Sequence, residues 1–322
     1  MAQVSIRGKG VAAACCAHLL RCSGITVSSD SSGASRVPAI VLGEITQRLA
    51  RDVFDRPELF RDAHRIERRM VAWGPGADLA TLPHSAVVVS EQQLSDLLQM
   101  EPSGSTEPDW TIYAARPLPP LVTEHAFGTR KAITMRVQLK EDADAAACQI
   151  ESMPEGWLFL IPTSPSEGWL IGVGSPAPEA SRLMESIATL APPSAEFPAY
   201  PRIAMPLAEQ GILCCGSAAL TFDPLCGDGT GHAIREAVLA TAVIRAGNPP
   251  GALEHYAARL IAGFRKHLEA CHGFYQSGGT SDWWKNELDA IRQGIQWCDR
   301  QLAQHGPFRY RLQDLELVTL GL

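Results

Sequence analysis

The sequence lacks a membrane-spanning segment, a secretion signal and a metal-binding motif. No apolar run approaches the ~20 residues of a membrane-spanning helix. The first apolar stretch is short and carries Arg7, Lys9 and His18, so no signal peptide is expected. None of the nine cysteines forms a C-x-x-C motif, and the nine histidines contain no H-x-x-x-H spacing. We therefore expect reduced thiols, no metal site, no membrane partner and a cytoplasmic location.

Basic residues are also in short supply relative to acidic ones. The formal net charge is −7, which argues against a nucleic-acid partner because such proteins present a basic surface. Apolar residues make up 46% of the 322 residues, which is enough for a sizeable core. This length allows one large domain or two closely joined domains.

The start of the chain predicts a strand, a glycine turn and a helix. Residues 3–7 have strand character, residues 8–13 read Gly-Lys-Gly-Val-Ala-Ala, and an apolar helix follows through Leu20. This G-x-G-x-x-A pattern is typical of dinucleotide-binding folds. Gly8 makes the turn, Gly10 lets the backbone approach a pyrophosphate, and Ala13 lets the helix pack closely on the strand. One copy is a weak signal, but its place at the start of the chain, before another strand-like stretch, strengthens it.

A second glycine turn lies late in the chain, within residues 211–245. A short apolar strand end is followed by a loop that reads Asp-Pro-Leu-Cys-Gly-Asp-Gly-Thr-Gly from Asp223, and then by an apolar-periodic helix over residues 233–244. Three glycines within five residues at the front of a helix expose backbone N–H groups, which can bind an anion or the polar edge of a heterocycle. A plain turn between a strand and a helix is the alternative for this segment taken alone.

Together the two turns resemble the flavin-dependent monooxygenases of the aromatic-hydroxylase type and the related flavin-dependent halogenases. In that superfamily a late G-D-A-A…P-x-x-G-x-G segment lies over the flavin. Here it reads Gly-Ser-Ala-Ala from Gly216 and Pro-Leu-Cys-Gly-Asp-Gly from Pro224. Residues 43–46 are similar to the halogenase Gly-Glu-Ala-Thr segment, residues 127–132 to the Gly-Arg-Arg segment and residues 156–162 to the Gly-Trp…Pro strand. Within the superfamily the sequence is most similar to the peptide-tryptophan hydroxylase that matures quinohemoprotein amine dehydrogenase.

The resemblance implies an α/β fold with a Rossmann-like FAD-binding domain, an inserted, mostly antiparallel substrate sheet and a C-terminal helical tail. The expected parts are a discontinuous FAD domain (1–60, 90–135 and 211–250), a substrate sheet (61–89 and 136–210) and a helical region (251–322). Four strand-like segments between residues 135 and 173, separated by short turns, support the antiparallel sheet. Helices are expected over residues 179–190, 253–274 and 283–304.

FAD is the cofactor that the resemblance implies. The residues expected to hold it lie at the first turn, after the early strands and in the late loop: Gly8, Gly10, Ala13, Asp30, Arg36, Gly43, Gly216, Ser217, Pro224, Gly227, Gly229, Thr230 and Gly231. Asp30 is the candidate for the ribose and Arg36 for the pyrophosphate, although either can equally be a solvated loop residue. His232 and Asp228 flank the late loop and are candidates for proton transfer with a phenol or indole, although His232 can also simply cap the helix.

The reaction that the resemblance implies is hydroxylation of an aromatic substrate, such as a tryptophan that is free or within a peptide, through a flavin C4a-hydroperoxide. Electrons would come from NAD(P)H or from a separate flavin reductase. Halogenation is disfavoured, because no lysine lies between Lys9 and Lys131 and because Asp228 would repel chloride from the loop. Ser28 or Ser29, Ser217 and His125 stand where the family has acids. A weakly flavin-binding or non-catalytic scaffold is therefore the alternative.

Overall fold

The structure, a computed structural model, describes residues 2–30, 38–98 and 107–320. One half is built on a five-stranded sheet of β1 (Gln3–Arg7), β2 (Thr26–Asp30), β6 (Trp110–Tyr113), β15 (Ala208–Glu209) and β16 (Ile212–Cys214). Strands β2, β1, β6 and β16 are parallel neighbours in that order, and β15 pairs antiparallel at the edge. The ends of β1 and β16 therefore lie at the same edge of the sheet, as the dinucleotide-fold prediction requires.

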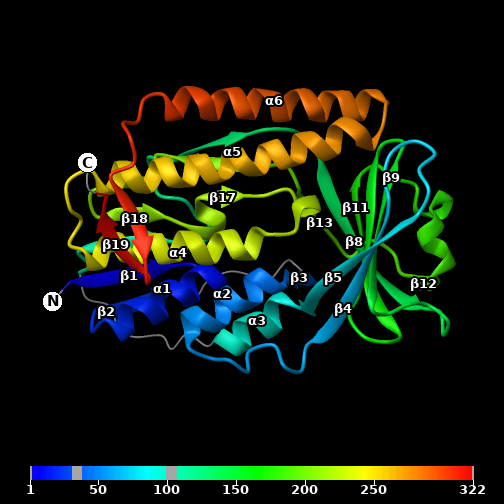
Figure 1. Cartoon of the computed structure of the whole chain (residues 1–322), viewed down its shortest axis with the longest axis horizontal. Helices are drawn as coiled ribbons and strands as arrows, with labels where there is room; N and C mark the ends of the chain where they lie inside the picture. The colour runs from blue at the N-terminus through cyan, green and yellow to red at the C-terminus, as the bar shows by residue number, and fades with distance from the viewer. Residues whose placement is uncertain (1, 31–37, 99–106, 321–322) are drawn as a thin grey trace.

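Three helices pack together beside this sheet: α1 (Val11–Cys22), α2 (Glu44–Phe54) and α4 (Gly229–Arg245). They run side by side in Figure 1. Small buried residues, among them Ala13, Cys16 and Ala17, cover much of α1 and permit close approach of its neighbours. The short helix α3 (Glu91–Leu98) packs against α1 as well.

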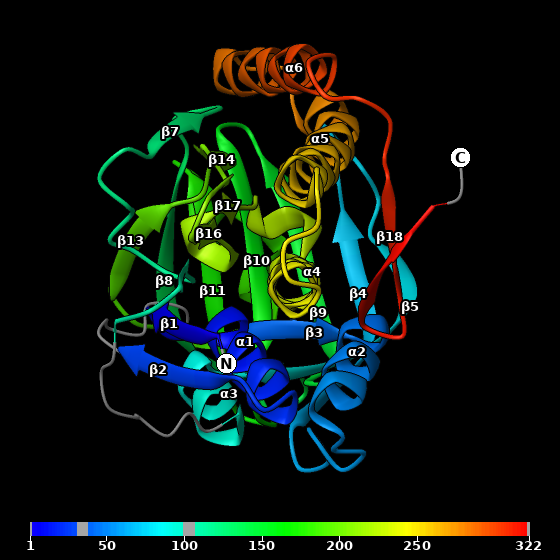
Figure 2. The same cartoon turned by 90° about the vertical axis from the view of Figure 1, so that its left-hand side faces the viewer.

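The other half is a nine-stranded, mostly antiparallel sheet, which Figure 2 shows behind α4. Its strands are β3 (Ile40–Gly43), β4 (His64–Ala72), β5 (Ala80–Val89), β8 (Lys131–Leu139), β9 (Ala147–Met153), β10 (Gly156–Pro162), β11 (Glu167–Gly174), β12 (Ile187–Leu190) and β13 (Ala195–Pro198). The predicted antiparallel order of the strands between residues 135 and 173 is confirmed, because β11 pairs with β8 and β10, and β10 with β9.

The two faces of this sheet bury different residues, because side chains alternate along each strand. We call the face that carries Trp157, Phe159 and Ile161 the inner face, since these residues belong to the large core shared with the helices. Leu158 and Leu160 lie on the outer face, in a separate small apolar cluster. A third sheet has three strands: β7 (Thr123–Ala126), β14 (Arg202–Met205) and β17 (Leu220–Thr221), with β14 in the middle.

Two long helices, α5 (Ala252–Gly278) and α6 (Asp282–Leu302), follow α4 as expected. None of the described helices combines the length and apolar character needed to span a bilayer.

Two expectations were wrong. Residues 179–190 form two short 3-10 turns, η1 (Pro178–Ala180) and η2 (Arg182–Glu185), and then β12, because pairing with β8 outweighs local helix propensity. The chain also does not end in helix: β18 (Tyr310–Gln313) and β19 (Glu316–Thr319) form a hairpin whose Glu316 pairs with Arg245 of α4.

Candidate functional site

The first glycine turn joins β1 to α1. The N–H of Gly8 donates to the carbonyl of Asp30, the last residue of β2, over 2.9 Å. Gly8 has a φ of +102°, and a Cβ added there would lie 2.5 Å from the Cβ of Ala115. Position 8 thus needs glycine both for its backbone angle and for the close approach of the segment after β6.

The late glycine-rich segment begins directly after β16, and its first residue contacts the first helical turn of α1. Gly216 begins η3 (Gly216–Ala218), and a Cβ on it would lie 2.7 Å from the Cβ of Ala12. The N–H of Gly216 also donates to Glu236 Oε2 in α4 over 2.7 Å. Burial raises the pKa of the Glu236 carboxyl well above its usual range, despite this hydrogen bond. Two segments far apart in the sequence are therefore fastened together at one edge of the sheet.

A hydrogen-bonded clasp joins α2 to the start of α4. Thr46 Oγ1 donates to Asp228 Oδ1 over 2.7 Å, and Arg235 Nη1 donates to Asp228 Oδ2 over 2.9 Å. Gly231 is packed beneath this Thr46–Asp228 clasp, since a Cβ there would lie 2.7 Å from Thr46 Oγ1. The segment at residues 43–46 and the late loop are thus in direct contact.

The N-terminal ends of α1, α2 and α4 share the same feature: none receives a side-chain cap from a described residue. Their N-cap residues are Gly10, Gly43 and Asp228. A helix leaves its first N–H groups without intrahelical partners, and the helix dipole makes this end positive. The Thr46–Asp228 clasp joins the ends of α2 and α4, and the end of α1 contacts Gly216, whose N–H is bonded to Glu236 of α4. Because α1 also packs directly on α4, the first N–H groups of the three helices lie in one region that suits an anion or a carbonyl.

Four glycines in this region face open space. A Cβ at Gly10, Gly43, Gly227 or Gly229 would meet no described atom within 4 Å. Gly10 and Gly227 also have positive φ angles, which explain their identity. Gly43, with a φ of −64°, and Gly229 have neither a strained backbone nor a packed neighbour. Bare backbone of this kind allows a flat ligand to lie close, so the region fits a dinucleotide that carries a planar ring.

A buried ionic network, which we call the Arg130 network, holds the start of the late loop. Arg130 Nε donates to Asp223 Oδ2 over 2.7 Å, and Arg130 Nη1 donates to Glu287 of α6. The Tyr275 hydroxyl of α5 donates to the same Asp223 oxygen over 2.7 Å. The side chains of Arg130 and Asp223 are 0% exposed. Burial opposes the charge of Arg130, but Tyr275, Asp223 and Glu287 together raise its pKa, so the guanidinium stays protonated.

Asp223 transmits this anchorage to the loop. Its Oδ1 accepts from the N–H of Leu225 over 2.8 Å and so caps η4 (Pro224–Cys226). Its own N–H donates to His267 Nε2 of α5 over 2.9 Å. The backbone that leads to Gly227 and Gly229 is therefore fixed from the side of α5, which is what preorganised donors require.

The structure places most of the predicted cofactor residues around this region. Asp30 ends β2 beside Gly8 and is exposed, Ala13 is buried in α1, and Ser217 is exposed in η3 with its Oγ 3.5 Å from the Ala114 carbonyl. Pro224 begins η4, and Thr230 lies in the first turn of α4. Arg36 lies outside the described residues.

The two catalytic candidates have different surroundings. Asp228 has both oxygens engaged by Thr46 and Arg235. The ring of His232 stacks on that of Phe222, with centroids 4.3 Å apart. Burial, opposed by the charge of Asp228, lowers the pKa of His232 to about 4, so its imidazole is neutral at pH 7.

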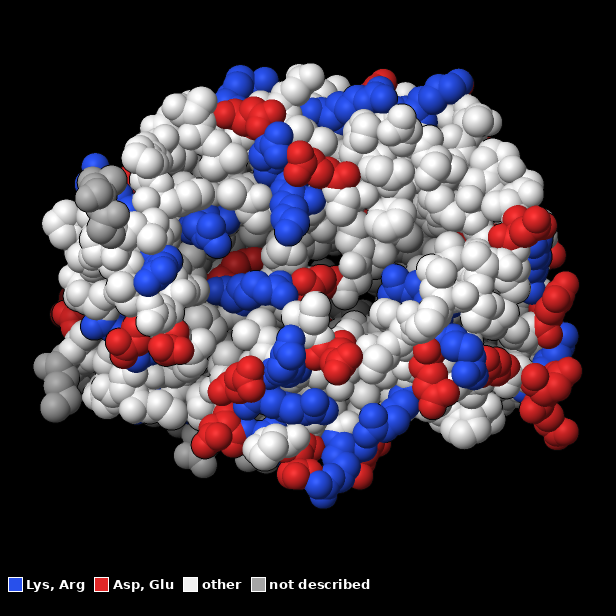
Figure 3. Space-filling view, viewed as in Figure 1, with Lys and Arg blue, Asp and Glu red and all other residues white. Residues whose placement is uncertain are grey.

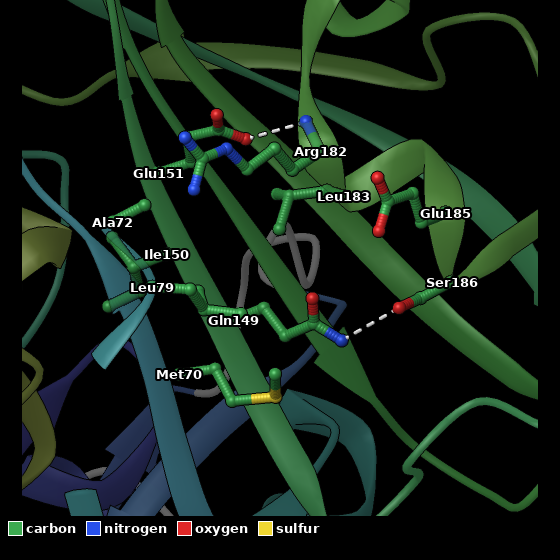
Figure 4. Close-up of a pocket in the computed structure, with 10 residues that line it drawn as sticks. All are labelled: Met70, Ala72, Leu79, Gln149, Ile150, Glu151, Arg182, Leu183, Glu185 and Ser186. Atoms are coloured by element: carbon green, nitrogen blue, oxygen red, sulfur yellow. Dashed lines mark hydrogen bonds between the residues drawn. The ribbon is translucent and has the colours of Figure 1, made fainter. Parts of the chain in front are cut away.

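A hollow of about 390 Å³ lies elsewhere, between β4, β9 and η2. Figure 4 shows Gln149 bonded to Ser186 and Glu151 bonded to Arg182 across it. Gln149 and Glu151 alternate with Ile150, which belongs to the large core, so this hollow opens on the outer face of the sheet. It is separate from the glycine turns. Figure 3 shows one face of the molecule. Acidic and basic side chains are interspersed on this face, and its surface is hollowed between the helical half and the nine-stranded sheet.

Sequence reasoning missed the Arg130 network and Glu236. The Arg130 side chain lay within a segment that the resemblance singled out, and an Asp before Pro224 is a common turn signal. Neither signal shows that Arg130, Asp223 and Glu287 meet in the core, because each comes from a different part of the chain. The buried carboxyl group of Glu236 has no periodic signature, since it lies on an otherwise apolar helix face.

A parallel sheet with a glycine turn, a late loop joined to residues 43–46 and a mostly antiparallel sheet beside them also occur in solved structures of flavin-dependent enzymes. Comparison with solved structures confirms this fold. The structure aligns with CmlS, a flavin-dependent halogenase, at a TM-score of 0.73 and 16% identity, covering 97% of this chain and 74% of CmlS.

Two further solved structures are informative. QhpG, a peptidyl tryptophan dihydroxylase essential for tryptophylquinone cofactor biogenesis, aligns at a TM-score of 0.68 and 18% identity, covering 88% of this chain and 78% of QhpG. HpxO of Klebsiella pneumoniae, solved as a complex with FAD, aligns at 0.66 and 15% identity, covering 94% and 99%. No protein-family model matches the chain, and no curated protein matches it in sequence. At these identities the likeness establishes the fold alone.

Proposed function

We propose that this protein is an FAD-dependent monooxygenase that hydroxylates an aromatic substrate. The observation that carries the proposal is the convergence of three uncapped helix ends around glycines that face open space. Gly43 and Gly229 lie at two of these ends, where the backbone is unstrained and no neighbour is close, so a ligand could approach the bare backbone.

Each part of the region has a proposed role toward FAD. The N–H groups at the start of α1, with Gly8 and Gly10, would hold the pyrophosphate, and Asp30 would hold the adenosine ribose. Arg36 remains a proposed phosphate contact. Bound FAD would supply the reduction of dioxygen and the transfer of one oxygen atom to the substrate.

The late loop and the segment at residues 43–46 would surround the planar ring. Backbone N–H groups at Gly229 and Thr230 would donate to ring carbonyls, with Gly227 leaving room for the ring, and the Arg130 network keeps that backbone in position. Ser217 would contact the chain that joins the ring to the phosphates. Its neutral hydroxyl contributes less than the acid that the family has there, which predicts weaker flavin binding.

The inner face of the sheet would cover the substrate. Its buried aromatic and aliphatic residues exclude water, which protects a reactive oxygen donor from unproductive breakdown. His232, neutral at pH 7, can accept a proton from a phenol or indole at the start of α4. Asp228 acts as a positioning residue in this proposal, because both of its oxygens are already hydrogen-bonded.

Hydroxylation is favoured over halogenation. No lysine lies between Lys9 and Lys131 in the sequence, so α2 and the two strands after it, β4 and β5, contain none. The ionised Asp228 at the loop would also oppose a chloride ion there. A tryptophan within a peptide is the substrate that we favour, because QhpG acts on a peptidyl tryptophan and has this fold. The electron donor would be NAD(P)H or a separate flavin reductase.

Flavin titration of the purified protein tests the proposal. Gly229→Asp should abolish FAD uptake, because the carboxylate enters the open space at the helix end and repels an anionic ligand. Gly263→Asp is a matched control: Gly263 is also helical, unstrained and open, but it lies in α5. Gly10→Asp should also abolish uptake, with added backbone strain. Unchanged FAD affinity in Gly229→Asp and Gly10→Asp would remove the site assignment.

Activity is then tested with FAD, a flavin reductase, NADH and candidate aromatics, including tryptophan-containing peptides. Mass spectrometry should show the gain of one oxygen atom. A protein that is colourless and takes up neither oxidised nor reduced FAD would instead support the alternative, a scaffold that kept this fold without its chemistry.

A further inference from the structure

Three side chains that the proposed chemistry does not use form a compact cluster behind the late loop. Cys226 ends η4, and His267 and Cys271 lie one turn apart on α5. Cys226 Sγ is 3.5 Å from Cys271 Sγ, and Cys271 Sγ is 3.3 Å from His267 Nε2. We call these residues the thiol cluster.

The fold holds the two sulfur atoms in place independently of each other. Cys226 belongs to η4, whose first residues are fixed by Asp223 and the Arg130 network. Cys271 is held by the helix itself, with its side chain in the core. The pair is also asymmetric: Cys226 is partly exposed, whereas Cys271 is 0% exposed. Cys226 is therefore the residue of the pair that lies nearer to solvent, and Cys271 lies deeper in the core.

The two thiols of the cluster also differ in pKa. The hydrogen bond from Cys271 lowers the pKa of Cys226 to about 6, although burial and Asp223 oppose this. Burial and the neighbouring Cys226 raise the pKa of Cys271 well above its usual range. At pH 7 the pair thus holds one thiolate, on Cys226, and one thiol, which donates to it. Thiolates rather than thiols are the nucleophiles in cysteine oxidation.

We propose that Cys226 and Cys271 form a peroxide-reactive dithiol, in which Cys226 reduces a hydroperoxide and Cys271 closes a disulfide. In the first step the Cys226 thiolate attacks one oxygen of hydrogen peroxide, the O–O bond breaks, and with one proton a sulfenic acid and water form. In the second step Cys271 sulfur attacks the sulfenic sulfur, the S–O bond breaks, and the thiol proton leaves with the hydroxyl as water. Overall, two thiols are oxidised to a disulfide and one peroxide is reduced to two waters.

A metal ion is the other use of two cysteines and a histidine, and the geometry is less suited to it. His267 Nε2 is the ring atom that faces Cys271, but its lone pair already accepts the N–H of Asp223 over 2.9 Å. A metal bound there would break the bond that fixes the start of the late loop. The dithiol needs no such rearrangement.

The chain contains a matched comparison for the pair. Cys16 Sγ and Cys215 Sγ are 3.9 Å apart, so they are also in contact, but both residues are 0% exposed. The pKa of Cys215 is raised well above its usual range by the hydrogen bond with Cys16 and by burial. Both pairs thus have two sulfur atoms in contact. Of the two pairs, only the thiol cluster has a partly exposed cysteine and a lowered thiol pKa.

Peroxide treatment of the reduced full-length protein tests the proposal. After exposure to stoichiometric hydrogen peroxide and trapping of free thiols with N-ethylmaleimide, mass spectrometry should find two fewer alkylated cysteines and a cross-linked peptide that joins Cys226 to Cys271. Cys226→Ser should abolish this cross-link. Cys271→Ser should also abolish it and leave a sulfenic acid at Cys226 that dimedone labels. Cys22→Ser, which removes an exposed cysteine beside His18, should leave the cross-link unchanged.

Three results would overturn the proposal. One is a folded wild-type protein, checked by circular dichroism, that forms no Cys226–Cys271 cross-link. Another is cross-linking of Cys16 to Cys215 at the same peroxide dose, which would indicate unselective oxidation. The third is stoichiometric zinc in the reduced wild-type protein that is lost in Cys226→Ser, which would make the cluster a metal site. None of these readouts depends on FAD, so they are independent of the proposed activity.

Discussion

Replacement of Arg130 by methionine gives the sharpest test of how this protein holds its late loop. The change keeps a long, flexible side chain but removes the charge that faces two buried carboxylates. Removal of one partner from a buried ion pair costs about 3–5 kcal/mol, because the remaining charge is left uncompensated. The entropy of unfolding scales at about 2.1 cal/mol/K per residue. For 322 residues this is roughly 0.7 kcal/mol/K, so the melting temperature should fall by about 4–7 °C.

The adjacent residue supplies the control. Lys131 makes an ion pair with Glu196 over 2.7 Å, but the two side chains are 62% and 55% exposed. Such pairs contribute roughly 0–1 kcal/mol, so Lys131→Met should lower the melting temperature by less than about 2 °C. The triple variant Arg130→Met, Asp223→Asn, Glu287→Gln should recover part of the loss, because it removes the uncompensated charges.

Thermal unfolding followed by circular dichroism measures these effects, and flavin titration measures the consequence for the site. Arg130→Met should weaken FAD binding as well as stability, because Arg130 and Tyr275 together hold the Asp223 carboxylate that caps η4, and one of these two donors is lost. Equal melting temperatures for Arg130→Met and Lys131→Met would refute the reasoning, since burial is the main difference between the two pairs.

Three other predictions follow from single contacts. Thr46→Val removes the donor of the Thr46–Asp228 clasp and should weaken FAD binding by about 1 kcal/mol, or roughly fivefold in a fluorescence titration. His232 has a folded pKa of about 4, below the ordinary value, so its contribution to stability is present above about pH 6.5 and is lost as the pH falls toward 4. His232→Gln should flatten the stability curve in that window by about 3 kcal/mol; an unchanged slope would contradict the assignment. Alkylation of Cys226 by iodoacetamide should fall as the pH drops through about 6, whereas an ordinary thiol loses reactivity below about pH 8.5. The groups that face Cys226 are Cys271, His267 and Asp223, and Cys271→Ala should move the Cys226 midpoint upward because it removes the hydrogen-bond donor.

The sequence allowed local structure to be predicted wherever a pattern of neighbouring residues decides it. The first strand, turn and helix, the strands between residues 135 and 173 and the helices expected over 253–274 and 283–304 are all present in the structure. The helix expected over residues 179–190 is absent, because a long-range pairing with β8 competes there. The terminal hairpin at Tyr310 was missed for the same reason: a short polar strand has no strong period, and its place depends on α4.

The candidate site shows the same division. Glycine turns at Gly10 and Gly229 were readable, because a run of bare backbone before an apolar helix is a property of adjacent residues. The contacts that bring these turns together could not be predicted from the sequence. Thr46 meets Asp228, and Gly216 meets Ala12, only after the chain has folded.

The amino-acid order alone therefore determined which segments turn and which helix ends carry free N–H donors. Only the tertiary structure decided that Arg130, Asp223 and Glu287 form one buried ionic network, and that Cys226 lies beside Cys271. The physical reason is that propensity and periodicity act over a few residues, whereas a buried charge or a shifted thiol pKa depends on every group that packing brings within a few ångströms.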